Sequence, residues 1–251
     1  KFLFDLTGFL IVRDVLSKEH LEVANAAIDS LELAQSPEYF GDSIALRGEN
    51  TSTRLGATRG LMELEKPFCE PFREMLAHPK TVPHLNTILG EGWRLDHGPG
   101  LIAMDKGCSG GMLHGSFDNA PYFYREGKIF TGLCVIEYLL ADEGPGDGGV
   151  CMVSGSHKAN FACPHDMEDA TQNPHCVPVL AATGDVVIFS EAMTHNAYPV
   201  TNDTIRRSVF FNYMPAIRVD HLPFQRMSQY PDHVLDRLSD ASELLTLSGY
   251  I

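Results

Sequence analysis

The sequence predicts a mainly β domain in which helices flank a β core. Between residues 93 and 216, short apolar runs alternate with Gly and Pro, a texture typical of β-sandwiches and barrels. Residues 17–90, by contrast, show the spacing of amphipathic helices. The chain has 251 residues, without an internal repeat or a low-complexity linker. We therefore expect a single domain over residues 1–251.

The N-terminal third is expected to form one strand followed by helices. Residues Gly8–Val15 are rich in β-branched side chains and predict a strand. Ser17 is a favourable N-cap for the helix that should follow it. Further helices are predicted over Leu61–Leu76 and over Val82–Leu89, and Gly90 is expected to end the second one. These helices should pack on the β core.

The remaining segments divide into a loop, a series of strands and a tail. Ala34–Thr58 is rich in Gly, Ser and Thr and predicts an irregular loop that could cover a site. His233–Leu247 has helical periodicity and predicts a C-terminal helix on the outside of the domain. The strands of the core are predicted at Leu101–Met104, Ile129–Leu140, Val150–Val153, Val177–Leu180, Val186–Ser190 and Ser208–Met214.

Composition narrows the class of function. The chain is 44% hydrophobic and 21% charged, with a net charge of −14, which is typical of a globular protein with a sizeable core. This acidity argues against a nucleic-acid partner and against an anionic membrane surface. No apolar run approaches the roughly 18 residues of a membrane span, and nothing resembles a signal peptide. The six cysteines form no Cys-x-x-Cys pair, so we expect reduced thiols and a cytoplasmic protein.

Two histidines stand in contexts suited to metal chemistry. His114 follows a Gly-rich approach, and His195 ends the apolar, strand-like run that begins at Gly184. Two imidazoles and one carboxylate form the facial triad of non-haem Fe(II) oxygenases, which leaves metal positions open for a cosubstrate and oxygen. Taken singly, neither histidine is a strong signal, because the chain has 11 histidines and each of the two can be explained as a loop or strand-end residue. The case depends on what accompanies them.

Arg206 is the first companion of this pair. It follows His195 by eleven positions, after the turn residues Asn202 and Asp203. A returning antiparallel strand would bring it close in space, where a guanidinium could bind a dicarboxylate bidentately. Arg207 should point to the opposite face of the same strand. Only one of the two arginines can therefore enter a pocket.

Several separated motifs together resemble one family. Ser154-Gly155-Ser156-His157-Lys158 is similar to the Pro-Gly-Ser-His motif of the phytanoyl-CoA dioxygenase family, with Ser154 in place of Pro. The opening Phe4–Val12 resembles that family's first strand. Gly184–Phe189 and Arg206–Phe211 complete the likeness in the right order. The resemblance covers nearly the whole chain, which makes it far more specific than any one motif.

This resemblance implies a double-stranded β-helix, the jelly-roll or cupin-like fold, with Fe(II) and 2-oxoglutarate as cofactor and cosubstrate. Members of the family use O2 and 2-oxoglutarate to oxidise an unactivated C–H bond of a small molecule. By position, His114 and His195 match the two metal histidines. Arg206 matches the arginine that binds 2-oxoglutarate, and His157 matches a histidine that contacts the same cosubstrate in some members. The protein's part is to orient these groups.

The third metal ligand departs from the family pattern. The family carries His-x-Asp, whose two side chains share one face of a strand, but Ser116 occupies the second position here. We favour Asp118 as the substitute ligand. Residues four apart in an extended strand lie about 13 Å from each other, so the chain would have to bend. Gly115 makes such a bend easy.

Two other arrangements stay open at this point. A carboxylate from elsewhere, Glu137 or Glu191, could complete the metal site. Alternatively the position is empty and admits water or a halide, as in the related halogenases. We accordingly weigh a hydroxylase against a halogenase-like enzyme, and both against a non-catalytic jelly-roll protein that binds a ligand. Retention of His114, His195 and Arg206 together favours an enzyme.

Overall fold

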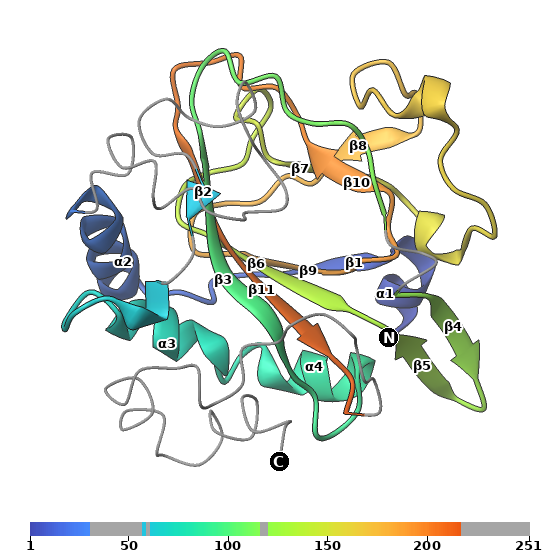
Figure 1. The fold of residues 1–251 in the computed structure, drawn as a ribbon, viewed down its shortest axis with the longest axis horizontal. Helices are drawn as coiled ribbons and strands as arrows, with labels where there is room; N and C mark the ends of the chain where they lie inside the picture. Colours follow the sequence, from blue (N-terminus) through green and yellow to red (C-terminus); the bar gives the residue numbers. More distant parts are fainter. Residues whose placement is uncertain (31–56, 59–60, 116–119, 217–251) are drawn as a thin grey trace.

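The computed structural model describes residues 1–30, 57–58, 61–115 and 120–216. Its centre is a pair of facing β-sheets (Figure 1). The larger sheet consists, in spatial order, of β1 (Phe9–Val12), β9 (Val186–Ser190), β6 (Cys134–Leu139), β11 (Arg206–Met214), β3 (Arg94–Met104) and β2 (Ala57–Thr58). The smaller sheet consists of β10 (His195–Ala197), β7 (Val150–Val153) and β8 (Cys176–Pro178). A separate hairpin joins β4 (Tyr122–Arg125) to β5 (Lys128–Thr131).

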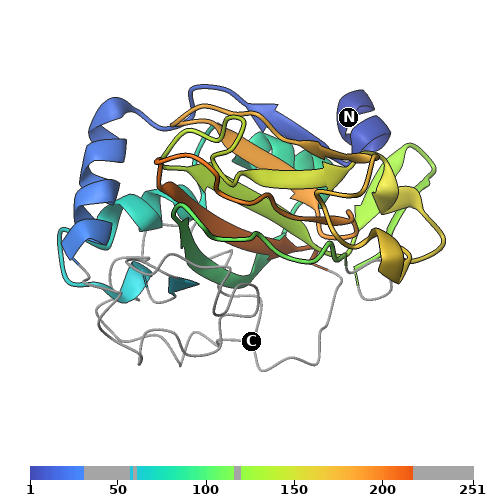
Figure 2. The same ribbon diagram turned by 90° about the horizontal axis from the view of Figure 1, so that it is seen from above.

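Helices cover the outer face of the larger sheet. Figure 2 shows the sheets stacked over one another, with the blue helix α2 at one end. The helical elements are α1 (Phe2–Thr7), α2 (Lys18–Ser30), α3 (Glu70–Leu76), α4 (Val82–Ile88) and the 3-10 turns η4 (Leu61–Glu63), η5 (Ser156–Lys158) and η6 (His165–Met167). Facing sheets flanked by helices confirm the predicted jelly-roll class.

Alternation along the strands produces two cores. Val209 and Phe211 of β11 point outward into a cluster that includes α2, α3 and α4. Val135 of β6 and Phe189 of β9 point inward and pack with the smaller sheet. The hydroxyl of the buried Tyr213 donates to a carbonyl at the end of α3, with an oxygen–oxygen distance of 2.6 Å. The inner faces of the two sheets therefore pack against each other as the second core.

The predicted start of α2 and the predicted end of α4 are confirmed. The backbone N–H of His20 donates to the Ser17 hydroxyl at 3.1 Å, which satisfies one donor in the first turn of α2. At the end of α4, Gly90 adopts a φ of 84°, a left-handed conformation that ends a helix at little cost. The predicted strand at Gly8–Val15 is present as β1, which pairs antiparallel with β9.

Several predicted elements differ in extent from those in the structure, and three of the differences have a clear cause. The single helix over Leu61–Leu76 is instead η4 and α3, because Pro67 lacks an N–H and disfavours a helical conformation at the residue before it. The single strand over Ile129–Leu140 is β5 and β6, which are separated around Gly132. Phe4–Thr7, expected to belong to the first strand, is helical in α1 and ends at Gly8, whose φ is 89°.

Other predictions fall partly outside the described residues. The predicted helix over 233–247 lies there, as does most of the predicted loop over 34–58. Ala57 and Thr58 are the exception, since they pair with β3 as β2. All six cysteines are free, as expected. None of the helices that the structure describes is long and apolar enough to cross a membrane.

Candidate metal centre

His195 is the first residue of β10, and a hydrogen bond to the backbone holds one nitrogen of its ring. Its Nδ1 lies 2.7 Å from the carbonyl oxygen of Met193, which accepts a hydrogen bond from the ring. That bond places the proton on Nδ1 and leaves the lone pair on Nε2, the arrangement typical of metal-binding histidines. Burial lowers the pKa of His195 to about 4, so the ring is neutral at physiological pH.

The backbone brings His114 beside His195. The N–H of His114 donates to the carbonyl of His195 at 3.0 Å, and the N–H of His195 donates back at 2.8 Å. The two ring centroids lie 4.4 Å apart. A Cβ atom on Gly115 would come within 2.5 Å of the Met193 carbonyl oxygen. Glycine at 115 is therefore required for this close approach.

The surroundings of His114 match those of His195 only in part. Its Nδ1 lies 3.3 Å from the carbonyl oxygen of Met112, again two residues earlier in the chain, but also 3.0 Å from the side-chain amide nitrogen of Asn196, which is a hydrogen-bond donor. The side chain itself is exposed. The protein atoms around the ring and the neighbouring His195 lower the pKa of His114 to about 4. Both imidazoles are thus neutral and able to act as ligands without losing a proton first.

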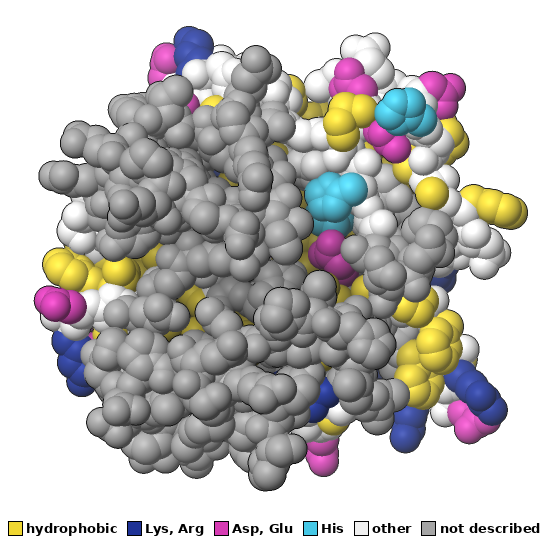
Figure 3. Space-filling view, in the orientation of Figure 1, with side chains coloured by type: hydrophobic (Ala, Val, Ile, Leu, Met, Phe, Trp, Pro, Cys, Tyr) yellow, Lys and Arg dark blue, Asp and Glu magenta, His cyan; other side chains and the backbone are white. Residues whose placement is uncertain are grey.

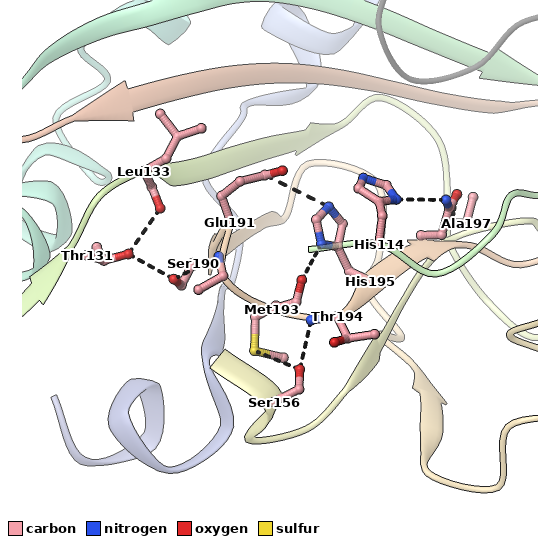
Figure 4. A network of polar contacts seen from close by, with 12 residues as sticks. His114, Thr131, Leu133, Ser156, Ser190, Glu191, Met193, Thr194, His195 and Ala197 are labelled. Atoms are coloured by element: carbon pink, nitrogen blue, oxygen red, sulfur yellow. Dashed lines mark hydrogen bonds and ion pairs between the residues drawn. The ribbon is translucent and has the colours of Figure 1, made fainter. Parts of the chain in front are cut away.

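Glu191 completes a group of three potential ligands. Its Oε2 lies 3.9 Å from Nε2 of His195. One ligand atom from each of Glu191, His195 and His114 lies within 4.8 Å of the other two, and no other such group of three occurs in the part of the chain described here. Figure 4 shows the carboxylate and both rings turned toward one another. In the space-filling view, a histidine and an acidic side chain lie side by side at the surface near the middle of this face (Figure 3).

Of the other two predicted acids, only Glu137 lies among the described residues, and it is not in this group. Asp118, the favoured third ligand, lies outside the described residues, as does Ser116. Glu137 is buried on the inner face of β6, where its Oε1 accepts from Nη2 of Arg206 at 2.6 Å. The alternative of Glu137 as a metal ligand therefore has no support in the described contacts.

Arg206 is held between two buried carboxylates. Besides Glu137, its Nε donates to Oε1 of Glu143 at 2.7 Å. Ser208 also donates to this oxygen, at 2.5 Å. Burial, and then the nearby charge of Glu143, raise the pKa of Glu137 to about 8. Arg207 points the other way, to Asp29 of α2 at 2.5 Å, as strand alternation predicts.

His157 lies behind the turn that carries His195. Its Nε2 contacts the carbonyl oxygen of Asp5 at 3.1 Å, and its ring meets that of Tyr122 edge-on with centroids 4.4 Å apart. The neighbouring Ser156 hydroxyl accepts from the N–H of Thr194 at 2.8 Å. No described contact joins His157 to Arg206. The predicted role of His157 toward the cosubstrate stays a prediction. Ser156, which the sequence did not single out, stabilises the turn before His195.

Comparisons with known proteins agree with this architecture. A family model described as phytanoyl-CoA dioxygenase (PhyH) matches residues 4–208. The dioxygenase lolE1 of Epichloe uncinata is 24% identical over 214 residues, which cover 80% of this chain and 73% of that protein. HygX from Streptomyces hygroscopicus with nickel and 2-oxoglutarate bound superposes with a TM-score of 0.70 at 20% identity, over 86% of each chain. The carbocyclase SnoK from nogalamycin biosynthesis gives a TM-score of 0.60 at 19% identity, over 86% of this chain and 82% of that chain.

The structural likenesses show the shared fold, and the family match extends from α1 into β11. It contains His114, His195 and Arg206, which the resemblance in sequence matched to the family's metal-binding and cosubstrate-binding residues. The chain therefore belongs to the phytanoyl-CoA dioxygenase family, a family of non-haem iron, 2-oxoglutarate-dependent dioxygenases.

Proposed function

We propose that this protein is an Fe(II)- and 2-oxoglutarate-dependent oxygenase that hydroxylates an unactivated C–H bond of a small organic molecule, with O2 as the oxidant. The observation that carries the proposal is the pair of neutral imidazoles, His114 and His195, next to the Glu191 carboxylate. Two nitrogens and one oxygen on one side of an ion are the donor set of non-haem Fe(II) oxygenases.

The donor atoms are of the kinds that iron binds, and the protein holds them in place before the metal is bound. Bound iron supplies the activation of O2, which the decarboxylation of 2-oxoglutarate drives. The chain's own part is to hold the ligands in place before the metal arrives. The Met193 carbonyl fixes the proton of His195 on Nδ1, and the ring of Phe189 meets the His195 ring edge-on at 4.9 Å. These contacts restrict the rotation of the imidazole.

The candidate residue for binding the cosubstrate is Arg206. Arg206 is proposed to bind the distal carboxylate of 2-oxoglutarate, in keeping with its offset from His195. Its Nε and Nη2 are already occupied by Glu143 and Glu137, and its exposed fraction is 2%. One cation between two carboxylates does not fit a further carboxylate unless Glu137 is protonated or moves. Binding of the cosubstrate at Arg206 would therefore depend on the protonation state of Glu137.

The similar proteins support a small substrate. One structure of HygX contains nickel, 2-oxoglutarate and hygromycin B. SnoN is described as a non-haem α-ketoglutarate-dependent epimerase and SnoK as a carbocyclase. These proteins share a fold with our chain and differ in reaction, so the outcome at the substrate must be assigned by experiment.

The experiment is anaerobic reconstitution with Fe(II), followed by addition of 2-oxoglutarate and then O2. We expect metal-dependent binding of 2-oxoglutarate by calorimetry and formation of succinate by mass spectrometry. His114→Ala and His195→Ala should abolish both. His165→Ala is the matched control, because this exposed histidine pairs with the Glu168 side chain and is not one of the three potential ligands. Binding of neither metal nor 2-oxoglutarate would instead favour the non-catalytic jelly-roll protein.

A further inference from the structure

We infer that Glu191 is the third protein ligand of the metal and takes the place of the missing acid of the His-x-Asp motif. The inference rests on the proposed function, because it presupposes a metal ion at His114 and His195. Glu191 precedes His195 by four residues, whereas the acid of the family motif would follow His114 by two. The acid is thus supplied by the segment of the second histidine instead of the first.

The distances between the side chains suit this role. Two ligands each about 2.1 Å from one ion lie about 3 Å apart when they are adjacent and about 4.2 Å apart when they are opposite. A facial triad needs adjacent ligands, so the 3.9 Å between Oε2 of Glu191 and Nε2 of His195, and the 4.8 Å limit for all three ligand atoms, exceed the required spacing by about 1–2 Å. A metal would need to draw the ligands together by about 1–2 Å at most. The rotatable side chain of Glu191 can supply that movement.

The backbone that carries Glu191 is held independently of any metal. Its N–H donates to the carbonyl of Leu133 at 3.1 Å. The turn that follows is closed by the N–H of Met193, which donates to the carbonyl of Ser190 at 2.9 Å. The Ser190 hydroxyl is in turn 2.8 Å from that of Thr131 (Figure 4). The Cα position of Glu191 is therefore set by Leu133, just before β6, and by the ends of β9 and β5, and only its side chain needs to adjust.

Burial also favours a ligand over a solvated acid. The Glu191 side chain is 16% exposed and the His195 side chain 9%. A carboxylate this far from bulk water is stabilised by a cation at the position that the two imidazoles surround.

This assignment bears on the type of reaction. A halogenase-like site needs an open metal position where the acid would stand, so that a halide can bind there. With Glu191 bound, the protein supplies two nitrogens and one oxygen, and that position is closed. The completed triad is the arrangement expected for oxygenation.

The test measures metal affinity, which does not depend on turnover or on knowing the substrate. Mn(II) is titrated calorimetrically into the apoprotein and its variants under conditions that exclude 2-oxoglutarate. We expect Glu191→Gln, which keeps the shape of the side chain, and Glu191→Ala each to weaken binding at least about tenfold. Glu168→Gln is the matched control, because its side chain pairs with His165 while its backbone carbonyl adjoins the His114 segment. Thermal unfolding of each apoprotein checks that the fold is retained.

A rescue variant adds a second readout. Ser116→Asp introduced into the Glu191→Gln protein restores the acid of the family motif, and we expect it to recover much of the lost Mn(II) affinity. Unchanged affinity in both Glu191 variants overturns the inference. In that case a loss in Asp118→Ala would assign Asp118, and tighter Mn(II) binding on addition of chloride would indicate an open position. If His114→Ala and His195→Ala do not weaken Mn(II) binding, the proposed function itself is contradicted. This outcome can be distinguished from a failure of the Glu191 inference alone.

Discussion

His114 and His195 are joined backbone to backbone, each donating its N–H to the carbonyl of the other, at 3.0 and 2.8 Å. This reciprocal pair is an isolated bridge and not part of a longer ladder. It fixes the spacing of the two imidazoles independently of a metal. The segment before Ser116 is thereby anchored to the turn that carries Glu191, and the geometry of the site depends on a few backbone contacts.

Gly115→Ala should damage the metal site through the backbone. The added Cβ would lie 2.5 Å from the carbonyl oxygen of Met193, so the bridge between the two histidines must open. We expect a loss of about 1–3 kcal/mol in the free energy of unfolding, as in other overpacked sites, and Mn(II) binding at least about tenfold weaker. Chemical denaturation and calorimetry measure the two quantities.

Gly127→Ala is the control for that variant. Gly127 lies in the β4–β5 hairpin turn with a φ of 82°, and a Cβ atom there would meet nothing within 4 Å among the described residues. Alanine at this position strains the backbone without touching the site. It should lower stability and leave Mn(II) affinity unchanged. Equal metal affinities in the two glycine variants would show that the backbone bridge does not position the ligands.

Ser156→Ala should loosen the turn before His195. The Ser156 hydroxyl accepts from the N–H of Thr194 at 2.8 Å, and alanine leaves that donor without its partner. We expect a cost of about 1–2 kcal/mol and a severalfold weaker affinity for Mn(II). Ser30→Ala, at the exposed end of α2, is the matched surface control: it removes one hydrogen bond to the Ala27 carbonyl in the same helix and should leave the Mn(II) affinity unchanged. A loss of stability without any change in metal affinity would limit Ser156 to a structural role.

Glu137→Gln should change how stability depends on pH. The pKa of Glu137 is raised to about 8 in the folded protein, above its ordinary value of 4.5. Between these two values the folded protein holds a proton that the unfolded chain releases, so the wild type loses stability as the pH rises. The glutamine variant lacks this dependence, which reaches at most about 1.4 kcal/mol per pH unit. Its stability relative to wild type should therefore be higher at pH 9 than at pH 5 in urea titrations, and a constant difference would contradict the raised pKa.

The same substitution tests whether Arg206 binds the cosubstrate. Above pH 8 the wild-type Glu137 is ionised, so its replacement by Gln removes a carboxylate that competes for the guanidinium. At pH 9 we therefore expect severalfold tighter binding of 2-oxoglutarate to the Mn(II)-loaded Glu137→Gln protein than to the wild type. In the wild type, affinity should rise as the pH falls from 9 to 7 and Glu137 takes up its proton. The variant should show a flatter profile. Identical affinities and pH profiles would separate Arg206 from the cosubstrate site.

Much of the fold follows from local patterns in the chain. The cap at Ser17, the stop at Gly90 and the β-branched runs act over a few residues, so they could be interpreted without knowing the rest of the molecule. The break at Pro67 was present in the sequence too, but helical periodicity on both sides of it concealed the interruption. The helix over Phe4–Thr7 was missed because its residues also suit a strand.

The order and spacing of motifs along the chain were enough to predict the family, the jelly-roll class and the two candidate histidines. Which side chains meet follows from the folded arrangement of the strands. Glu191 reaches the histidines because β9 ends in a turn beside His114, and Glu137 is committed to Arg206 because β6 and β11 place both on the inner face. Such contacts are set by strand register and sheet packing, which join residues far apart in the chain.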